Sequence, residues 1–108
     1  MANIVIHLSQ NPPTFTPGMY SVRVGETFEI EVHRSTALST PEFRELPEGV
    51  SEINRIVVNP NVTTITMKVT SDARSGALTI LAKRTGPQPQ LVDEKTSSGW
   101  IEVMPAMG

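Results

Sequence analysis

The sequence contains no cysteine. It therefore has no disulfide framework, no thiolate metal site and no cysteine nucleophile, whichever compartment it occupies. It also lacks an excess of charge of one sign, because nine Lys and Arg residues stand against eleven Asp and Glu residues, for a net charge of −2. This near-neutral balance favours neither nucleic acid nor an anionic membrane as a partner.

Long hydrophobic runs are missing as well. No stretch approaches the roughly 20 apolar residues that a membrane-spanning helix needs, so we expect no membrane insertion. Residues 1–8 lack the basic start and the apolar run of a signal peptide. We expect either a cytoplasmic chain or a piece of a longer exported one. The 108 residues fit a single domain, 1–108, with one core.

The apolar repeat of an amphipathic helix, about 3.6 residues long, is not found in any segment. Apolar and polar side chains instead alternate, most clearly in residues 62–70 and 77–84, which are joined by turn-forming residues 71–76. The connection is too long for a two-residue hairpin turn. It is either a longer hairpin loop or, as we favour, a crossing between two sheets. The side chains predicted to face inward here are Ile65, Met67, Val69, Leu78, Ile80 and Ala82.

Shorter alternating segments fill the rest of the chain, and nine prolines and seven glycines separate them. This pattern predicts an all-β sandwich of about seven antiparallel strands in two sheets. The inward side chains of two of these segments are Phe28, Ile30, Val32, Ile101 and Val103. The further predicted strands are residues 3–8, 20–24, 27–33, 43–46, 53–58 and 100–104, and residues 86–99 are predicted to form a long loop.

Three parts of the chain resemble a known family. The run ELPEGV at residues 45–50 resembles the leucine-proline-x-glycine-valine turn of bacterial immunoglobulin-like domains. Residues 63–82 are similar to the end of those domains, and residues 28–32 are similar to their second strand. The resemblance covers residues 20–104. Many members carry a tyrosine shortly after the glycine of this segment, where the present sequence has Leu78.

The resemblance implies an immunoglobulin-like sandwich of the kind found in adhesins, cell-wall enzymes, virion proteins and secreted binding modules. It favours an extracellular, cell-surface or virion setting. In such a sandwich the strand at residues 27–33 pairs with the strand at 62–70, and we expect Glu29 and Glu31 to face Thr66 and Lys68. The last two strands also pair, which predicts that Lys83 and Glu102 lie near each other.

Residues that carry out chemistry are not grouped in the sequence. It has no Gly-x-Ser-x-Gly elbow and no glycine-rich phosphate loop. His7 and His33 lie in separate predicted strands, which is too few ligands for a metal site. We therefore predict a protein that is not an enzyme, with no catalytic residues, no metal and no cofactor.

The candidate binding residues are centred on Trp100. If Ile101 faces inward, Trp100 faces outward, and Leu81 on the neighbouring strand does the same. Leu91 and Val92, from the predicted loop, would flank an exposed apolar patch, which is typical of a binding hot spot. In the alternative, the loop folds back and Leu91 buries Trp100 in a small satellite core.

Two functional hypotheses follow. The leading one is a non-enzymatic immunoglobulin-like module that binds a protein or glycan, or spaces neighbouring domains in tandem, in a surface, secreted or virion protein. The alternative is a small stand-alone subunit that assembles with itself, as a homo-oligomer, or with a larger complex through its edge strands. The identity of the ligand does not follow from the residues.

Overall fold

The computed structural model describes residues 2–10, 12–35, 38–83 and 94–105. These residues form strands and no helix. The strands of this part of the chain are β1 (Ile4–His7), β2 (Thr14–Thr16), β3 (Met19–Arg23), β4 (Thr27–His33), β5 (Glu42–Glu45), β6 (Val50–Asn59), β7 (Val62–Val69), β8 (Gly76–Lys83) and β9 (Glu94–Met104).

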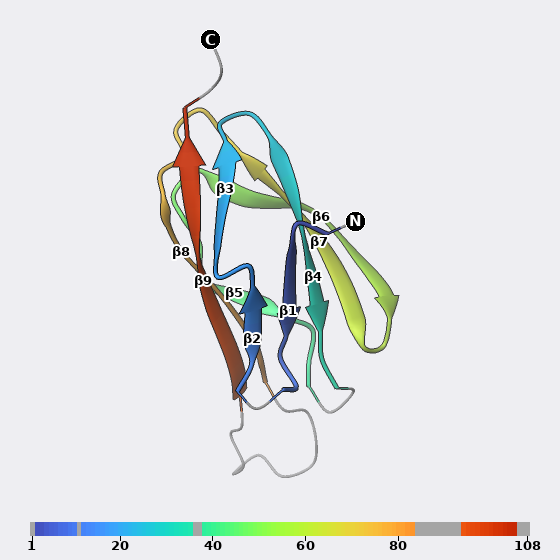
Figure 1. Ribbon diagram of the computed structural model, residues 1–108. Coiled ribbons are helices and arrows are strands. Elements are labelled where there is room, and N and C mark those ends of the chain that lie inside the picture. The colour runs from blue at the N-terminus through green and yellow to red at the C-terminus, as the bar shows by residue number, and fades with distance from the viewer. Residues whose placement is uncertain (1, 11, 36–37, 84–93, 106–108) are drawn as a thin grey trace.

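The strands form two sheets, as Figure 1 shows. A five-stranded sheet has the order β2-β1-β4-β7-β6, and a four-stranded sheet has the order β3-β9-β8-β5. The predicted all-β sandwich is confirmed. The described residues contain nine strands, however, rather than about seven. The expectation of antiparallel pairing throughout is wrong, because β1 runs parallel to β4 and β3 runs parallel to β9.

The connection between β7 and β8 crosses between the sheets, as predicted. β7 belongs to the five-stranded sheet and β8 to the four-stranded sheet. The turn before β6 holds this crossing in place, because Thr70 N–H donates to the Gly49 carbonyl at 2.9 Å and Arg74 N–H donates to the Glu48 carbonyl at 2.9 Å. Gly49 has a φ of 79°, a conformation that glycine adopts without a steric penalty.

The core fills the space between the sheets with the side chains that the alternation pattern assigned to the inside. All the predicted inward side chains are buried except Val103, which is partly buried and packs against the core. Burying each of the large ones contributes about 1.5–3 kcal/mol. Ile4, Ile6, Leu8, Val22, Leu38 and Val50 complete the cluster.

The two predicted strand pairings are present, since β4 pairs with β7 and β8 pairs with β9. The charge contacts predicted with them are wrong. Glu29 does face Thr66, but Lys68 faces Thr27. Lys83 faces Glu94, at the opposite end of β9 from Glu102. Knowing which strands are neighbours did not give the register between them.

Two strands extend beyond the sequence prediction by more than one residue, and a third strand was not predicted. β9 begins at Glu94, so residues 94–99 are strand rather than loop. β6 covers residues 50–59 rather than 53–58. β2 was not predicted, because its three residues lie between prolines at 13 and 17. β2 nevertheless closes one open side of the sandwich.

The contact that closes this side joins Phe15 to Gly99. A Cβ added to Gly99 would meet the ring of Phe15. Phe15 belongs to β2 of one sheet and Gly99 to β9 of the other. A second link is the hydrogen bond that the Ser97 hydroxyl donates to the Thr14 carbonyl at 2.9 Å. Glycine at position 99 therefore lets an aromatic ring lie directly on the backbone of the opposite sheet.

In the part of the chain that the structure describes, no helix has the length and apolar character needed to cross a membrane.

Candidate interaction surfaces

Large hydrophobic side chains are exposed at two places on the described surface. Four of them lie on β6 and two lie on the four-stranded sheet. The exposed fractions of Ile53, Ile56, Val57 and Val58 are 55%, 55%, 54% and 59%, and those of Met19 and Trp100 are 55% and 45%. Apolar groups gathered in this way mark candidate interaction surfaces.

β6 is the outermost strand of the five-stranded sheet, on the right of Figure 1. It pairs with β7 on one side, and no described strand lies on its other side. Such an edge presents backbone N–H and C=O groups that can pair with another strand. At ten residues, β6 is also long for an edge strand. We call Val50–Asn59 with its free backbone the β6 edge.

Two bulges shape the β6 edge. The register with β7 shifts between Glu52 and Asn54 and again between Val57 and Asn59, so Ile53 and Val58 have no partner opposite them. A bulge adds one residue to one strand and bends it locally. Both extra residues are aliphatic and exposed, so the irregular positions of this edge present apolar side chains to solvent.

The register with β7 also shows which way each β6 side chain points. Glu52 faces Met67, and Arg55 faces Ile65. Because Met67 and Ile65 point into the core, Glu52 and Arg55 lie on the inner side of β6. Asn54 and Ile56 face Thr66 and Thr64 and therefore lie on the outer side. At these two positions the inner side of the edge carries an acid and a base, whereas Val50 at its start belongs to the core.

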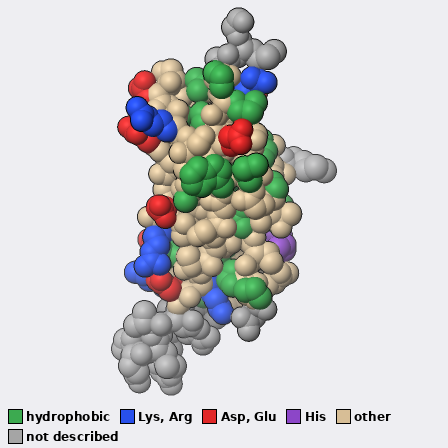
Figure 2. Space-filling view, turned by 60° about the vertical axis from the view of Figure 1, so that its left-hand side comes forward, with side chains coloured by type: hydrophobic (Ala, Val, Ile, Leu, Met, Phe, Trp, Pro, Cys, Tyr) green, Lys and Arg blue, Asp and Glu red, His purple; other side chains and the backbone are tan. Residues whose placement is uncertain are grey.

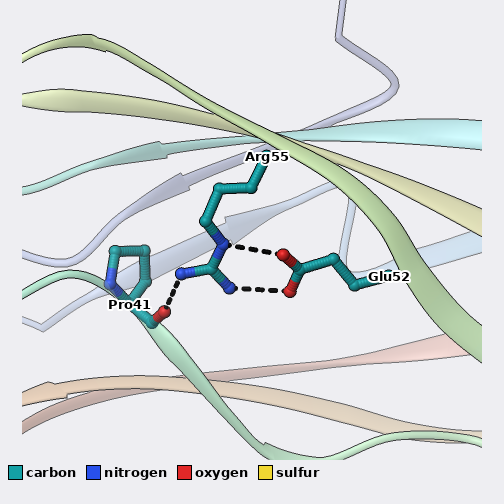
Figure 3. Close-up of polar contacts among 3 residues, drawn as sticks. All are labelled: Pro41, Glu52 and Arg55. Atoms are coloured by element: carbon teal, nitrogen blue, oxygen red, sulfur yellow. Dashed lines mark hydrogen bonds and ion pairs between the residues drawn. The ribbon is translucent and has the colours of Figure 1, made fainter.

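Glu52 and Arg55 form a clip across the open side of the sandwich, drawn in Figure 3. Arg55 Nε donates to one carboxylate oxygen of Glu52 at 2.9 Å, and Arg55 Nη2 donates to the other at 2.8 Å. Arg55 Nη1 also donates to the carbonyl of Pro41, which directly precedes β5. The clip therefore ties the edge of the five-stranded sheet to the edge of the four-stranded sheet.

Met19 and Trp100 form the second surface. They are register partners in the parallel pair of β3 and β9, and Trp100 also faces Ala77 of β8. Figure 2 shows this side of the molecule, with hydrophobic side chains gathered across its middle. Trp100 is exposed, as the sequence predicted. Its role in binding stays a prediction.

The expectation that Leu81 is exposed beside Trp100 is wrong. Leu81 is only 8% exposed and faces Thr96, four residues along β9 from Trp100. Arg44 of β5 and Glu94 of β9 form an ion pair at 3.1 Å across β8, the strand that carries Leu81. The other two candidates, Leu91 and Val92, lie outside the described residues. Met19, which the alternation pattern did not single out, is the exposed neighbour of Trp100.

The two histidines lie together. His7 of β1 faces His33 of β4, and their rings are stacked with centroids 4.5 Å apart. His33 Nε2 lies 2.6 Å from a carboxylate oxygen of Glu31. With Arg34 and Asn61 among its other lining residues, the pair borders a shallow hollow of about 260 Å³ at the end of the sandwich. Across the described ranges, no three His, Cys, Asp or Glu side chains are placed to hold a metal ion.

The sequence matches no protein-family model and no curated protein. The fold, by contrast, is similar to solved structures. The chain superposes on the cysteine protease inhibitor EhICP2 from Entamoeba histolytica with a TM-score of 0.56 and 11% identity, covering 93% of each chain. It also superposes on an endo-fucoidan hydrolase of glycoside hydrolase family 107 with a TM-score of 0.52 and 12% identity.

The two similarities differ in extent. The chain corresponds to nearly the whole of the inhibitor, whereas it spans only 14% of the hydrolase chain. At identities of 11% and 12%, both show a shared β-sandwich fold and no shared activity.

Proposed function

We propose that this protein is a non-enzymatic binding module whose partner adds a strand to the β6 edge. The observation that carries the proposal is the exposure of four aliphatic side chains on one ten-residue edge strand. In strand addition, backbone hydrogen bonds supply affinity and alternate side chains supply specificity. The β6 edge offers both kinds of contact.

Composition supports a surface that binds rather than one that is merely solvated. Lysine, proline and a very short length are among the features that keep edge strands from pairing. β6 has neither residue type, and its charged residues, Glu52 and Arg55, neutralise each other. Three of the four exposed aliphatic residues are consecutive, at positions 56–58.

The bulges support a selective partner. A bulged edge does not match an arbitrary flat strand, because the partner has to accommodate the extra residue at Ile53 or Val58. Inward-pointing charges such as Glu52 and Arg55 limit uncontrolled pairing in the same way. We therefore propose recognition of one strand with a matching register. The resemblance to bacterial immunoglobulin-like domains favours a surface, secreted or virion setting for this module.

Site-specific photo-crosslinking tests the proposal. A photoreactive residue in place of Ile56 is expected to crosslink to a protein partner in the source cells or particles. The same residue in place of Ser98, which is exposed on the four-stranded sheet, is the matched control and is expected to give a much lower yield. Equal yields at the two positions, or no crosslink from position 56, would contradict the proposal.

A second candidate function is inhibition of a cysteine protease. It is favoured by the similarity to EhICP2, which covers 93% of both chains. Two hydrogen bonds join the residue after β4 to the turn before β7: Arg34 N–H donates to the Asn61 carbonyl at 2.9 Å, and Asn61 Nδ2 donates to the Arg34 carbonyl at 3.1 Å. Titration of a cysteine protease with the purified protein tests this candidate. Unchanged protease activity at a large excess of the protein would reject it.

A further inference from the structure

We infer that the strand added to the β6 edge is the β6 strand of a second copy of this chain, so that two sandwiches join about a two-fold axis. This inference rests on the proposed function, because it names the partner of the same edge. It assigns an antiparallel register in which Glu52 of one protomer faces Arg55 of the partner subunit. The two five-stranded sheets would then form one continuous sheet.

The register is restricted first by the face of the sheet, inner or outer, on which each β6 side chain lies. Residues directly opposite each other in an antiparallel pair point to the same face of the sheet. A two-fold axis perpendicular to the sheet keeps inner faces together, so an inner residue has to meet an inner residue. Glu52 opposite the partner's Arg55 satisfies this condition, since both lie on the inner side.

The same register satisfies the condition along the rest of the strand. Val50 meets the partner's Val57. These residues face Val69 and Thr63 of β7, which are both buried, and so lie on the inner side. Ser51 meets the partner's Ile56, and both lie on the outer side. The bulged Ile53 meets the partner's Asn54 next to the axis. The bulge at Ile53 therefore falls at the centre of the interface, and each protomer contributes one such bulge there.

Charge complementarity selects this register among those that keep the sides matched. Placing Arg55 opposite the partner's Arg55 also keeps the sides matched but brings two positive charges together. With Glu52 opposite the partner's Arg55, two attractive cross-strand pairs form, one on each side of the axis. The Arg55 guanidinium has more N–H donors than its three observed bonds use, so it can donate to both carboxylates.

Charge-swap mixing tests the register. The wild-type protein is expected to have the mass of a dimer by size-exclusion chromatography with light scattering. E52R and R55E should each be monomeric at the same concentration, with the dimer dissociation constant raised about tenfold or more, because both attractive pairs become repulsive. A one-to-one mixture of the two variants should recover a dimer, since each protomer now supplies the charge that the other needs.

Recovery of the dimer on mixing cannot come from the Glu52–Arg55 clip within one protomer, because each single variant has lost that clip. The double variant E52R/R55E restores both the clip and the cross-strand pairs, so it should dimerise alone even if the single variants fold poorly. R44E, which breaks the ion pair with Glu94 on the other sheet, is the matched control and should remain dimeric. I53K should be monomeric and folded, because Ile53 is exposed and lies next to the axis.

A wild-type protein that is monomeric at all accessible concentrations would overturn the inference. Single variants that stay dimeric, or a mixture that stays monomeric, would overturn it too. The crosslinking experiment distinguishes rejection of self-pairing from rejection of the proposed function. A crosslink from position 56 to a different protein would retain strand addition at the β6 edge and reject self-pairing, whereas the absence of any crosslink there would reject both.

Discussion

Tyr20 of β3 packs its ring against that of Phe28 of β4, with the ring centroids 5.5 Å apart. Because β3 and β4 belong to different sheets, this pair bridges the two layers of the sandwich. Burial raises the pKa of the Tyr20 phenol above its usual value near 10, and the nearby Glu26 carboxylate raises the pKa further. Since Tyr20 is the only tyrosine, its ionisation can be followed without interference from another phenol.

The first prediction concerns alkaline pH. A pKa that is raised in the folded state means that the phenol stabilises the fold fully below its unfolded pKa of about 10, and that this contribution is lost as pH rises towards the folded value. Ultraviolet titration of tyrosinate should therefore give a midpoint above 10. Urea unfolding at rising pH should show a loss of stability that is smaller in Tyr20→Phe. If Tyr20→Phe loses as much stability at alkaline pH as the wild type, the loss comes from a titratable group other than Tyr20.

The second prediction compares two glycines with positive φ. Gly25 has a φ of 90° and nothing near the position of a Cβ, whereas Gly49 has a φ of 79° and a Cβ there would clash with the backbone of Ala73. Gly25→Ala should lower the free energy of unfolding by about 1–2 kcal/mol through backbone strain alone. Gly49→Ala should lower it by about 1–3 kcal/mol more, because it also overpacks the turn. Similar losses in chemical denaturation would show that the contact with Ala73 is unimportant.

The third prediction tests the contact between Phe15 and Gly99. Gly99→Ala should destabilise the protein by about 1–3 kcal/mol, since the new methyl group displaces the Phe15 ring. In a Phe15→Ala background the ring is gone, so the same substitution should have a much smaller effect. A double-mutant cycle by thermal unfolding measures the difference. Gly18→Ala serves as the control, because nothing lies near its added Cβ.

The fourth prediction compares two arginine ion pairs. The side chain of Arg55 is 25% exposed and makes a bidentate contact, whereas that of Arg44 is 57% exposed and makes one bond. Arg55→Gln should lower the free energy of unfolding by about 1–2 kcal/mol, since the clip also holds Pro41. Arg44→Gln should lower it by less than about 1 kcal/mol. Both are best measured at low protein concentration, where dimerisation does not contribute.

The fifth prediction concerns Trp100. Because Trp100 is 45% exposed and Leu81 is 8% exposed, Trp100→Ala should destabilise the fold by about 1 kcal/mol and Leu81→Ala by about 2 kcal/mol or more. Trp100 is the only tryptophan in the sequence, so the protein's tryptophan fluorescence measures the solvent exposure of this position alone. Because the side chain is exposed, acrylamide should quench this fluorescence readily. A melting temperature that falls more for Trp100→Ala than for Leu81→Ala would show that Trp100 belongs to a satellite core.

The alternation of side chains predicted the interior of this protein well. Ile65, Met67, Leu78 and Ile80 are fully buried, because an alternating segment in a sandwich has one face that only the core can accept. The crossing after β7 was favoured as well, but its length and turn residues excluded only a tight hairpin, and the preference for a crossing over a longer hairpin loop came from the rest of the chain. Only the burial pattern therefore depends on local sequence alone.

Features that depend on which strands are neighbours were not predictable from local sequence. The stacking of His7 on His33 requires the parallel pairing of β1 with β4, which no local pattern encodes. The apolar residues at positions 53 and 56–58 of β6 look like core residues in the sequence, yet they are exposed on the last strand of their sheet. The first six residues of β9, EKTSSG, lack apolar alternation and form a strand through pairing with β8.

The strand order β3-β9-β8-β5 determines when the four-stranded sheet can be completed. In the described part of the chain, β3 has no neighbour in its own sheet except β9, the last strand to be made. During synthesis, residues 19–23 therefore cannot pair within the four-stranded sheet until residues 100–104 have left the ribosome. An early strand and a late strand therefore meet along a single seam, and the four-stranded layer is complete only when that seam has formed.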